Sequence, residues 1–254
     1  MIRTFAVAAP LCYNGFIKKG STIMAIYVTG DTHGRFNRIW DFSKRYSTHR
    51  SDIMIILGDA GINFAGGERD EMIKRGLKNL RLQLLCVHGN HEMRPESVGS
   101  YEEIEWHGGT VYVEPQYPNL LFAKDGEIYD IAYQKCIAIG GAYSVDKPYR
   151  LANGWPWFAD EQPSEEIKSR VEQRLETEGW QVDIVLSHTC PLKYEPRETF
   201  MQGIDQSAVD NSTEIWLNSI EERLTYKRWY AGHYHVAKYI DRMRFLFEDY
   251  RRIG

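Results

Sequence analysis

The sequence predicts an α/β fold, because short apolar runs that end in glycine alternate with segments of helical periodicity. A chain of 254 residues without internal repeats or an obvious linker also favours one large domain. The nearly continuous apolar character of the runs is typical of strands covered on both faces. The predicted strands are AIYVTG (25–30), DIMIILGD (52–59), QLLCVHGN (83–90), CIAIGGAY (136–143), DIVLSH (183–188) and RWYAGH (228–233).

Helical patterns lie between these strands, as an α/β fold requires. Residues 37–48 and 69–82 are predicted crossover helices. A third helix begins after Ser164, which is a favourable N-cap residue followed by two glutamates. A fourth runs over residues 212–224, and residues 237–250 predict two short strands or a hairpin.

The first 23 residues are predicted to be a non-native or disordered extension, with the folded domain spanning residues 24–254. Met24 stands immediately before the first convincing strand. Codons for the preceding Lys18, Lys19 and Gly20 can encode a purine-rich ribosome-binding site. The short apolar stretch near the start resembles a signal peptide only weakly, since Pro10 interrupts it.

Composition excludes several classes of function. A net charge of −4 without a stripe of Lys or Arg argues against an extended nucleic-acid-binding surface. No apolar run reaches the ~18 residues of a membrane-spanning helix. The four cysteines lack metal-binding spacing, which favours reduced thiols in a cytoplasmic protein; they are Cys12, Cys86, Cys136 and Cys190.

Polar side chains gather where five of the predicted strands end. Spacings of about thirty residues from Asp31 to Asp59 and on to Asn90 match successive βαβ units. Parallel strands in such units place their carboxyl ends at one edge of the sheet, where ligands bind. The strand-end residues are Asp31, His33, Asp59, Asn90, His91, His188, His233 and His235.

These residue types are suited to divalent metal ions. Carboxylates, imidazoles and an Asn carbonyl form a mixed oxygen and nitrogen set typical of Mn, Fe or Zn sites. Seven candidate ligands are too many for one ion but suffice for two that share a carboxylate, an arrangement used in phosphoester hydrolysis. His91 is not needed as a ligand, so it is free to donate a proton to a phosphate oxygen or a leaving group. Each motif alone is ordinary turn chemistry, and the metal site is favoured because all five occur together.

The blocks GDTHG, GDAG, GNHE, SHT and GHYH resemble the signatures of the calcineurin-like metallophosphoesterase superfamily. The segment GGAYSVDKPYRLANGWPW is similar to that of uncharacterised bacterial and phage-type members. The resemblance implies a four-layer αββα sandwich of two mixed β-sheets flanked by helices. It also implies that His91 is the catalytic histidine and that Asp59 bridges the metals. One ion would be held by Asp31, His33, Asp59 and His235, and the other by Asp59, Asn90, His188 and His233.

One departure from the superfamily pattern concerns the second block. GNHE is the variant of the protein serine/threonine phosphatases, whose second block continues with an Asp that supports the catalytic His and an Arg that binds phosphate. Ile62 and Asn63 occupy those two offsets here. A protein-phosphatase assignment is therefore disfavoured, although it stays among the alternatives.

The segment from Arg150 to Trp157 is open to two interpretations. It is either an aromatic loop packed on the core or a substrate-side lip, with Arg150 binding phosphate and Trp155 stacking on a base or aromatic group. In the second interpretation Arg150 follows a predicted strand through YSVDKPY (143–149).

The resulting prediction is a dinuclear-metal hydrolase of phosphate monoesters or diesters that uses a metal-bridging hydroxide. Manganese is the favoured metal, with Fe, Zn, Ni or Mg as alternatives. The expected partner is a small phosphorylated substrate such as a nucleotide, with no membrane. The alternatives are a nuclease or cyclic-nucleotide phosphodiesterase, and a non-catalytic scaffold, which the complete ligand set disfavours. The oligomeric state is left open.

Overall fold

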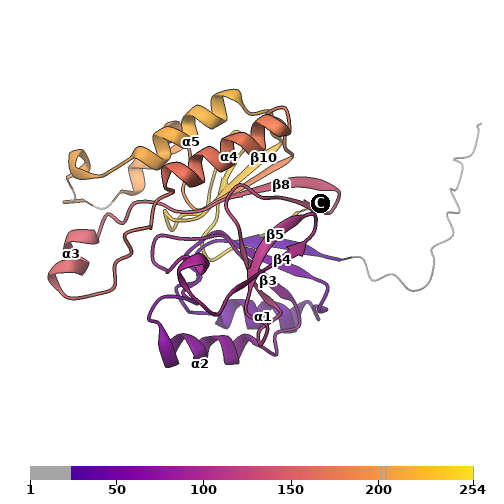
Figure 1. Cartoon of the computed structure of the whole chain (residues 1–254). Coiled ribbons are helices and arrows are strands. Elements are labelled where there is room, and N and C mark those ends of the chain that lie inside the picture. The colour runs from indigo at the N-terminus through magenta and orange to yellow at the C-terminus, as the bar shows by residue number, and fades with distance from the viewer. Residues whose placement is uncertain (1–23, 201, 204, 254) are drawn as a thin grey trace, which may run out of the picture.

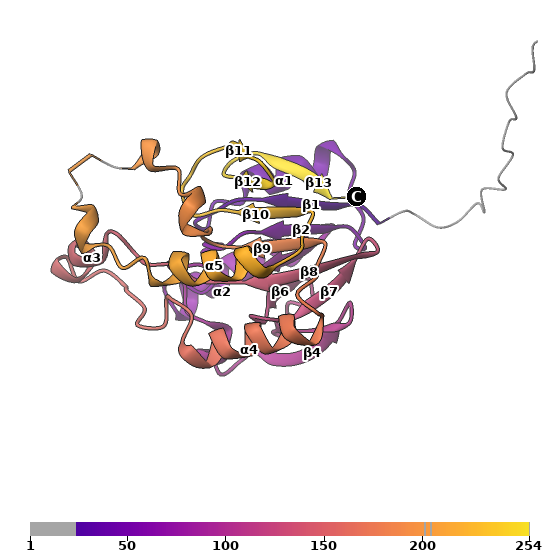
Figure 2. The same cartoon turned by 90° about the horizontal axis from the view of Figure 1, so that it is seen from above.

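Two mixed sheets lie face to face in the computed structural model, which describes residues 24–200, 202–203 and 205–253. The predicted extension over residues 1–23 lies outside the described residues. The seven-stranded sheet has the order β13-β1-β2-β3-β6-β5-β4, and the six-stranded sheet β11-β12-β10-β9-β8-β7. Helices cover the outer faces, which gives the predicted four-layer αββα sandwich (Figures 1 and 2).

The bounds of the elements follow. The strands are β1 (Ile26–Thr29), β2 (Ile53–Ile56), β3 (Gln83–Cys86), β4 (Glu102–Trp106), β5 (Gly109–Val113), β6 (Leu120–Ala123), β7 (Ile128–Ile131), β8 (Gln134–Ile139), β9 (Ile184–Ser187), β10 (Arg228–Ala231), β11 (Lys238–Ile240), β12 (Met243–Phe245) and β13 (Tyr250–Ile253). The α-helices are α1 (Asn37–Arg45), α2 (Gly67–Leu77), α3 (Lys147–Ala152), α4 (Glu165–Thr177) and α5 (Ser212–Arg223).

Strand β2 shows why the strands read as continuous apolar runs. Successive side chains point to opposite faces of a sheet, and here both faces are covered. Ile53 and Ile55 belong to the core between the two sheets. Met54 and Ile56 belong to the core under α1 and α2. A third core joins the six-stranded sheet to α4 and α5. In Figure 1, α4 and α5 lie on one side of the sandwich, and α1 and α2 lie on the other.

The six predicted strands and the four predicted helices are present, with ends that differ by a few residues. Ser164 caps α4 as expected, since its Oγ accepts a hydrogen bond from the backbone N–H of Ile167. The expected hairpin near the C-terminus is the antiparallel pair β11 and β12. Cys86, Cys136 and Cys190 are buried free thiols, in accord with the prediction, whereas Cys12 lies outside the described residues.

One prediction about local structure was wrong. Arg150 does not follow a strand through residues 143–149, because Lys147–Ala152 forms the short helix α3. Pro148 lies in the first turn of this helix, where a proline sacrifices no hydrogen bond and its fixed φ favours the helical conformation. Figure 1 shows α3 set apart from the four helices that cover the sheets.

The topology places the motif-bearing loops at one edge. Strands β1, β2 and β3 are adjacent and parallel, so the loops that carry Asp31, Asp59 and Asn90 leave the same side of the sheet. In the other sheet β9 and β10 are also parallel neighbours, and the loops after them carry His188 and His233. Among the described helices, none has the length and apolar character needed to cross a membrane.

Candidate metal centre

All eight predicted strand-end residues come together at the carboxyl ends of β1, β2, β3, β9 and β10. Three groups of side chains have ligand atoms close enough to share a cation: Asp31 with His33 and His235; His33 with Asp59 and His91; and Asp31 with Asp59 and His188. The groups overlap, so they form one continuous centre. Asn90 joins it through His188 Nε2, which lies 2.8 Å from Asn90 Oδ1. The His233 ring lies 4.9 Å from the His188 ring.

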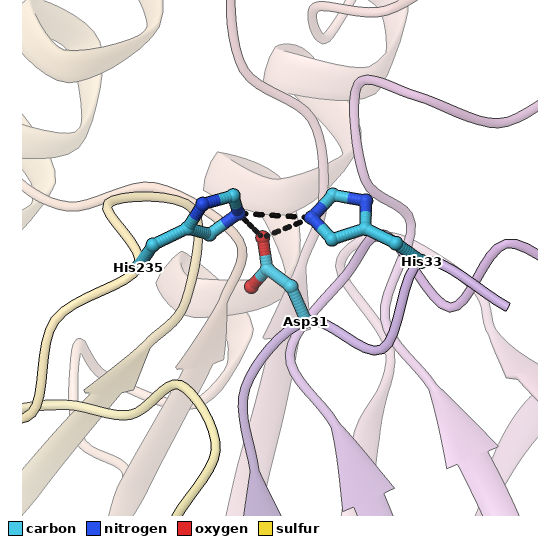
Figure 3. A group of neighbouring side chains, drawn as sticks. All are labelled: Asp31, His33 and His235. Carbon is cyan, nitrogen blue, oxygen red and sulfur yellow. Dashed lines mark hydrogen bonds and ion pairs between the residues drawn. The ribbon is translucent and has the colours of Figure 1, made fainter. Parts of the chain in front are cut away.

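The first part of the centre is formed by Asp31, His33 and His235, whose polar atoms point toward one another (Figure 3). The His33 and His235 Nε2 atoms are 2.9 Å apart. Asp31 Oδ2 lies 3.2 Å from His235 Nε2 and 3.8 Å from His33 Nε2. Asp31 Oδ1 accepts a hydrogen bond from the backbone N–H of His233, whereas the buried Oδ2 has no hydrogen-bond partner among the described residues. A cation among these three side chains would satisfy that oxygen.

Asp59 lies between the two parts of the centre. Its Oδ1 accepts a hydrogen bond from the backbone N–H of His91 and lies 3.7 Å from His188 Nε2. Its Oδ2 lies 3.9 Å from His33 Nδ1. The carboxylate therefore reaches ligand atoms on both sides, as a bridging ligand must.

His188 and Asn90 present two acceptor atoms to each other. His188 Nδ1 lies 2.7 Å from the Leu57 carbonyl oxygen, so Nδ1 carries a proton, and in the neutral ring Nε2 is then an acceptor. Asn90 Nδ2 donates to Ser144 Oγ at 2.8 Å, and this contact turns Asn90 Oδ1 toward that same Nε2. Two lone pairs at 2.8 Å repel each other unless a proton or a cation lies between them. The donor set therefore fits a divalent metal ion.

The backbone around the centre is strained in a way that supports a functional site. His33, Asp59, His233 and His235 all have positive φ values, between 48° and 63°, which non-glycine residues rarely adopt. A Cβ atom on Gly89 would lie 2.0 Å from Asp59 Oδ1, so the close approach of the loops after β2 and β3 requires glycine there.

Glu92 joins the same two loops. It is fully buried, and its carboxylate faces the backbone N–H groups of Ala60, Gly61 and Gly89 at 3.4, 3.2 and 3.0 Å. The last residue of the GNHE block therefore fixes the loop that carries Asn90 against the loop that carries Asp59.

The pKa values of two histidines of the centre are shifted in opposite directions by their surroundings. Burial lowers the pKa of His233 to about 3, so its imidazole is neutral at physiological pH. For His235 the contact of Nε2 with the Asp31 carboxylate is the main influence, and it raises the pKa of the ring above its ordinary value. Imidazole must be unprotonated to bind a metal, so binding at His235 is expected to release a proton.

His91 has distinct neighbours at its two ring nitrogens. Arg150 Nη2 donates to His91 Nδ1 at 3.0 Å, and because a guanidinium has only donors, His91 Nδ1 is the acceptor. His91 Nε2 therefore carries the proton and faces Asp146 Oδ1 at 3.5 Å. Burial lowers the pKa of His91, but Asp146 and Asp59 outweigh it, so that the pKa lies above its ordinary value.

Asp146 is a residue of this site that sequence reasoning missed. Its Oδ2 accepts a hydrogen bond from Arg150 Nε at 2.8 Å, while its Oδ1 faces His91. The i,i+4 spacing of an acid and an arginine is a visible signal for such a pair on a helix. A strand over residues 143–149, as the sequence pattern predicts, would not bring the two side chains together.

Arg150 and Trp155 occupy different environments. Arg150 is 7% exposed and adjoins the centre through its contact with His91. Trp155 is 52% exposed and contacts Tyr149 edge-to-face, with ring centroids 5.4 Å apart. Trp155 lies outside the three hydrophobic cores, and it is not a lining residue of the cavities described below.

Comparison with known proteins identifies the class to which this fold and site belong. The sequence profile of the calcineurin-like phosphoesterase family matches residues 24–237, so the chain belongs to that family. No curated protein sequence matched the chain.

Solved structures resemble the chain in fold at low sequence identity. Phosphopantetheinyl hydrolase (PptH) from Mycobacterium tuberculosis has a TM-score of 0.50 and 15% identity, over 88% of each chain. TT1561 of Thermus thermophilus has a TM-score of 0.44 and 14% identity, over 83% of this chain and 82% of the other.

Proposed function

We propose that this protein hydrolyses phosphate esters at a centre of two divalent metal ions. The observation that carries the proposal is the opposed pair of acceptors, His188 Nε2 and Asn90 Oδ1, held 2.8 Å apart by contacts on their far sides. The unpartnered Oδ2 of Asp31 supports a cation in the other part of the centre. Asp59 reaches both parts, and manganese is the proposed metal because the set mixes oxygen and nitrogen ligands.

The ligands are proposed as two sets that share Asp59. Asp31, His33 and His235 complete one set, and Asn90, His188 and His233 complete the other. When bound, the two cations supply a nucleophile near neutral pH and stabilise the negative charge of the transition state. The cavities on either side of the centre are of a size suited to a small phosphorylated substrate.

His91, Asp146 and Arg150 are proposed to act on the substrate side of the centre. Arg150 binds phosphate oxygens with its guanidinium, which now contacts His91 Nδ1. Asp146 orients the His91 ring through Nε2. Once a phosphate group engages Arg150, His91 Nδ1 is free to take up a proton from solvent, and the doubly protonated ring, whose pKa is raised, then donates that proton to the departing oxygen. Asp146 and Arg150 would thus perform, from α3, the roles for which Ile62 and Asn63 lack suitable side chains.

Turnover of p-nitrophenyl phosphate and bis-p-nitrophenyl phosphate by the manganese-loaded protein tests this function. Hydrolysis of the monoester, the diester or both is expected, and the ratio separates a phosphomonoesterase from a phosphodiesterase or nuclease. A protein that binds manganese but hydrolyses neither compound would indicate a non-catalytic scaffold. A cytoplasmic location stays a prediction, supported by the buried free cysteines.

A further inference from the structure

A cavity of about 510 Å³ opens directly from the metal centre. Asp59, Asn90 and His91 line its inner end. By surface area its lining is mostly apolar, with contributions from Val145, Phe200, Val209 and Val236. This volume is enough for an organic group of small-ligand size. The cavity is therefore placed to hold the group to which the reacting phosphate is attached.

The charged side chains that line this cavity, apart from the proposed metal ligands, are all acidic. It is lined by no lysine or arginine among the described residues, whereas Asp146, Glu195 and Glu214 line it beyond the metal ligands. Asp146 is paired with Arg150, and Glu195 with Arg197. In the described part of the chain Glu214 has no cationic partner within ion-pair distance. Burial raises the pKa of Glu214 to about 7, so above that pH it is the uncompensated carboxylate of the cavity.

Glu214 is fixed in position but incompletely hydrogen-bonded. It extends from α5, is 4% exposed, and accepts a hydrogen bond at Oε1 from Thr189 Oγ1 at 2.7 Å. Tyr234 Oη lies 3.0 Å from the same Thr189 hydroxyl and completes the chain of contacts. Glu214 Oε2 is buried and has no hydrogen-bond partner among the described residues. An N–H donor from a ligand would remove the cost of that unpaired oxygen.

A second cavity, of about 340 Å³, adjoins the centre and has the opposite character. His33 and His91 of the centre line it, together with Arg35, Arg69 and Arg150 and one acidic residue, Asp70. The side chains of Arg35 and Arg69 are exposed and make no ion pair within the described ranges. Additional negative charge on a substrate is accommodated here more favourably than beside Glu214.

We propose that the phosphate ester hydrolysed by this protein carries an organic group with apolar surface and an N–H donor, an amine or an amide, which occupies the Glu214 cavity. This inference rests on the proposed hydrolase function. The apolar walls bind the hydrocarbon part, and the free oxygen of Glu214 accepts the N–H. An organic group that ends in a carboxylate would be opposed by Glu214 and is disfavoured.

Three aryl phosphates with similar leaving groups test the inference: the phosphates of tyramine, 4-ethylphenol and 3-(4-hydroxyphenyl)propionate. With manganese-loaded protein, kcat/KM is expected to be at least about tenfold higher for the ammonium than for the carboxylate compound, because hydrogen bonds to charged groups exceed ~1.4 kcal/mol. The ethyl compound is expected between them. Glu214→Gln should reduce the ratio of the ammonium to the carboxylate compound to within about threefold.

Glu222→Gln, on the exposed side of the same helix, is the matched control and should leave the ratio unchanged. Calorimetric binding of the free phenols to the wild type gives a readout independent of turnover, and tyramine is expected to bind more tightly than the carboxylate phenol. Turnover of all three phosphates with equal or reversed preference would overturn this inference and leave the hydrolase function intact. No turnover of any of them or of the nitrophenyl esters by metal-loaded protein would overturn both.

Discussion

At His91 the two ring nitrogens have different neighbours, and this difference determines what truncation should do. The His91→Ala variant removes the proposed proton donor but not a proposed metal ligand. We expect turnover of an alkyl phosphate to fall by roughly 10²–10⁴-fold, the usual effect of losing a positioned acid. The loss should be smaller for p-nitrophenyl phosphate, whose leaving group needs little protonation. Elemental analysis should show unchanged metal content.

The competing role for His91 is that of a metal ligand, because its ring lies near His33 and Asp59 in one of the three cation-compatible groups. If His91→Ala loses one equivalent of metal while remaining folded, His91 is a ligand and the proton-donor assignment is wrong.

Asp146 is expected to act through His91. It raises the pKa of that ring, so His91 keeps its proton to higher pH than an isolated histidine would. Asp146→Asn should therefore move the alkaline fall of kcat/KM toward lower pH, with metal content unchanged. An unchanged pH profile in a folded, metal-replete Asp146→Asn variant would show that Asp146 does not position the acid.

Variants of Arg150 and Trp155 can distinguish a substrate-binding role for this segment from a role in packing. Arg150→Ala should lower kcat/KM for every phosphate ester by roughly tenfold or more, because charge-assisted bonds to phosphate are lost. Trp155→Ala should lower kcat/KM mainly for substrates with a base or aromatic group, since this half-exposed side chain can stack only on such a group. The kinetic constants of each variant must be compared with its melting temperature. Activity that falls only in proportion to unfolded protein would assign both residues to packing.

The loops after β2 and β3 approach each other closely at Gly89, and their positions depend on the absence of a side chain there. A Cβ there would lie 2.1 Å from the Asp59 backbone nitrogen, so Gly89→Ala must push the loops apart. We expect a loss of about 1–3 kcal/mol in unfolding free energy, together with weakened metal binding. Gly99→Ala is the control, because its added Cβ would have no neighbour within 4 Å. Equal metal affinity in the Gly89→Ala variant and the wild type would contradict the coupling of the two loops.

Burial and length determine which helices and strands could be predicted from the sequence. Six strands were predictable because both of their faces are buried and their apolar runs are long, namely β1, β2, β3, β8, β9 and β10. The equally buried β6, with four residues, was not predicted. Strand β4 was not predicted, because four of its five residues are exposed and three of those are glutamates. Such an edge strand is defined by its pairing with β5, which a sequence pattern does not report. Helix α3 has only six residues, too few for helical periodicity to be recognised.

For the whole molecule, the gathering of the proposed metal ligands was predictable because each follows a strand in its own short motif. Parallel strand order then brings those motifs to one edge. The Glu214 cavity was not predictable, because its walls come from loops and from α5, which are far apart in sequence. The roles of Asp146 and Arg150 likewise depend on how α3 approaches His91. Distances across the fold, rather than local patterns, determine this part of the site.

The two-metal centre is best tested by metal titration, in which p-nitrophenyl phosphate turnover is measured as manganese is returned to chelator-stripped protein. We expect turnover to rise steeply as the second equivalent binds, because Asp59 is proposed to serve both ions. Asp59→Asn should bind at most one equivalent and lose most activity while remaining folded. Wild-type turnover that is already maximal with no metal or with one equivalent would contradict the dinuclear centre. Two tightly bound ions with full turnover in Asp59→Asn would contradict it equally.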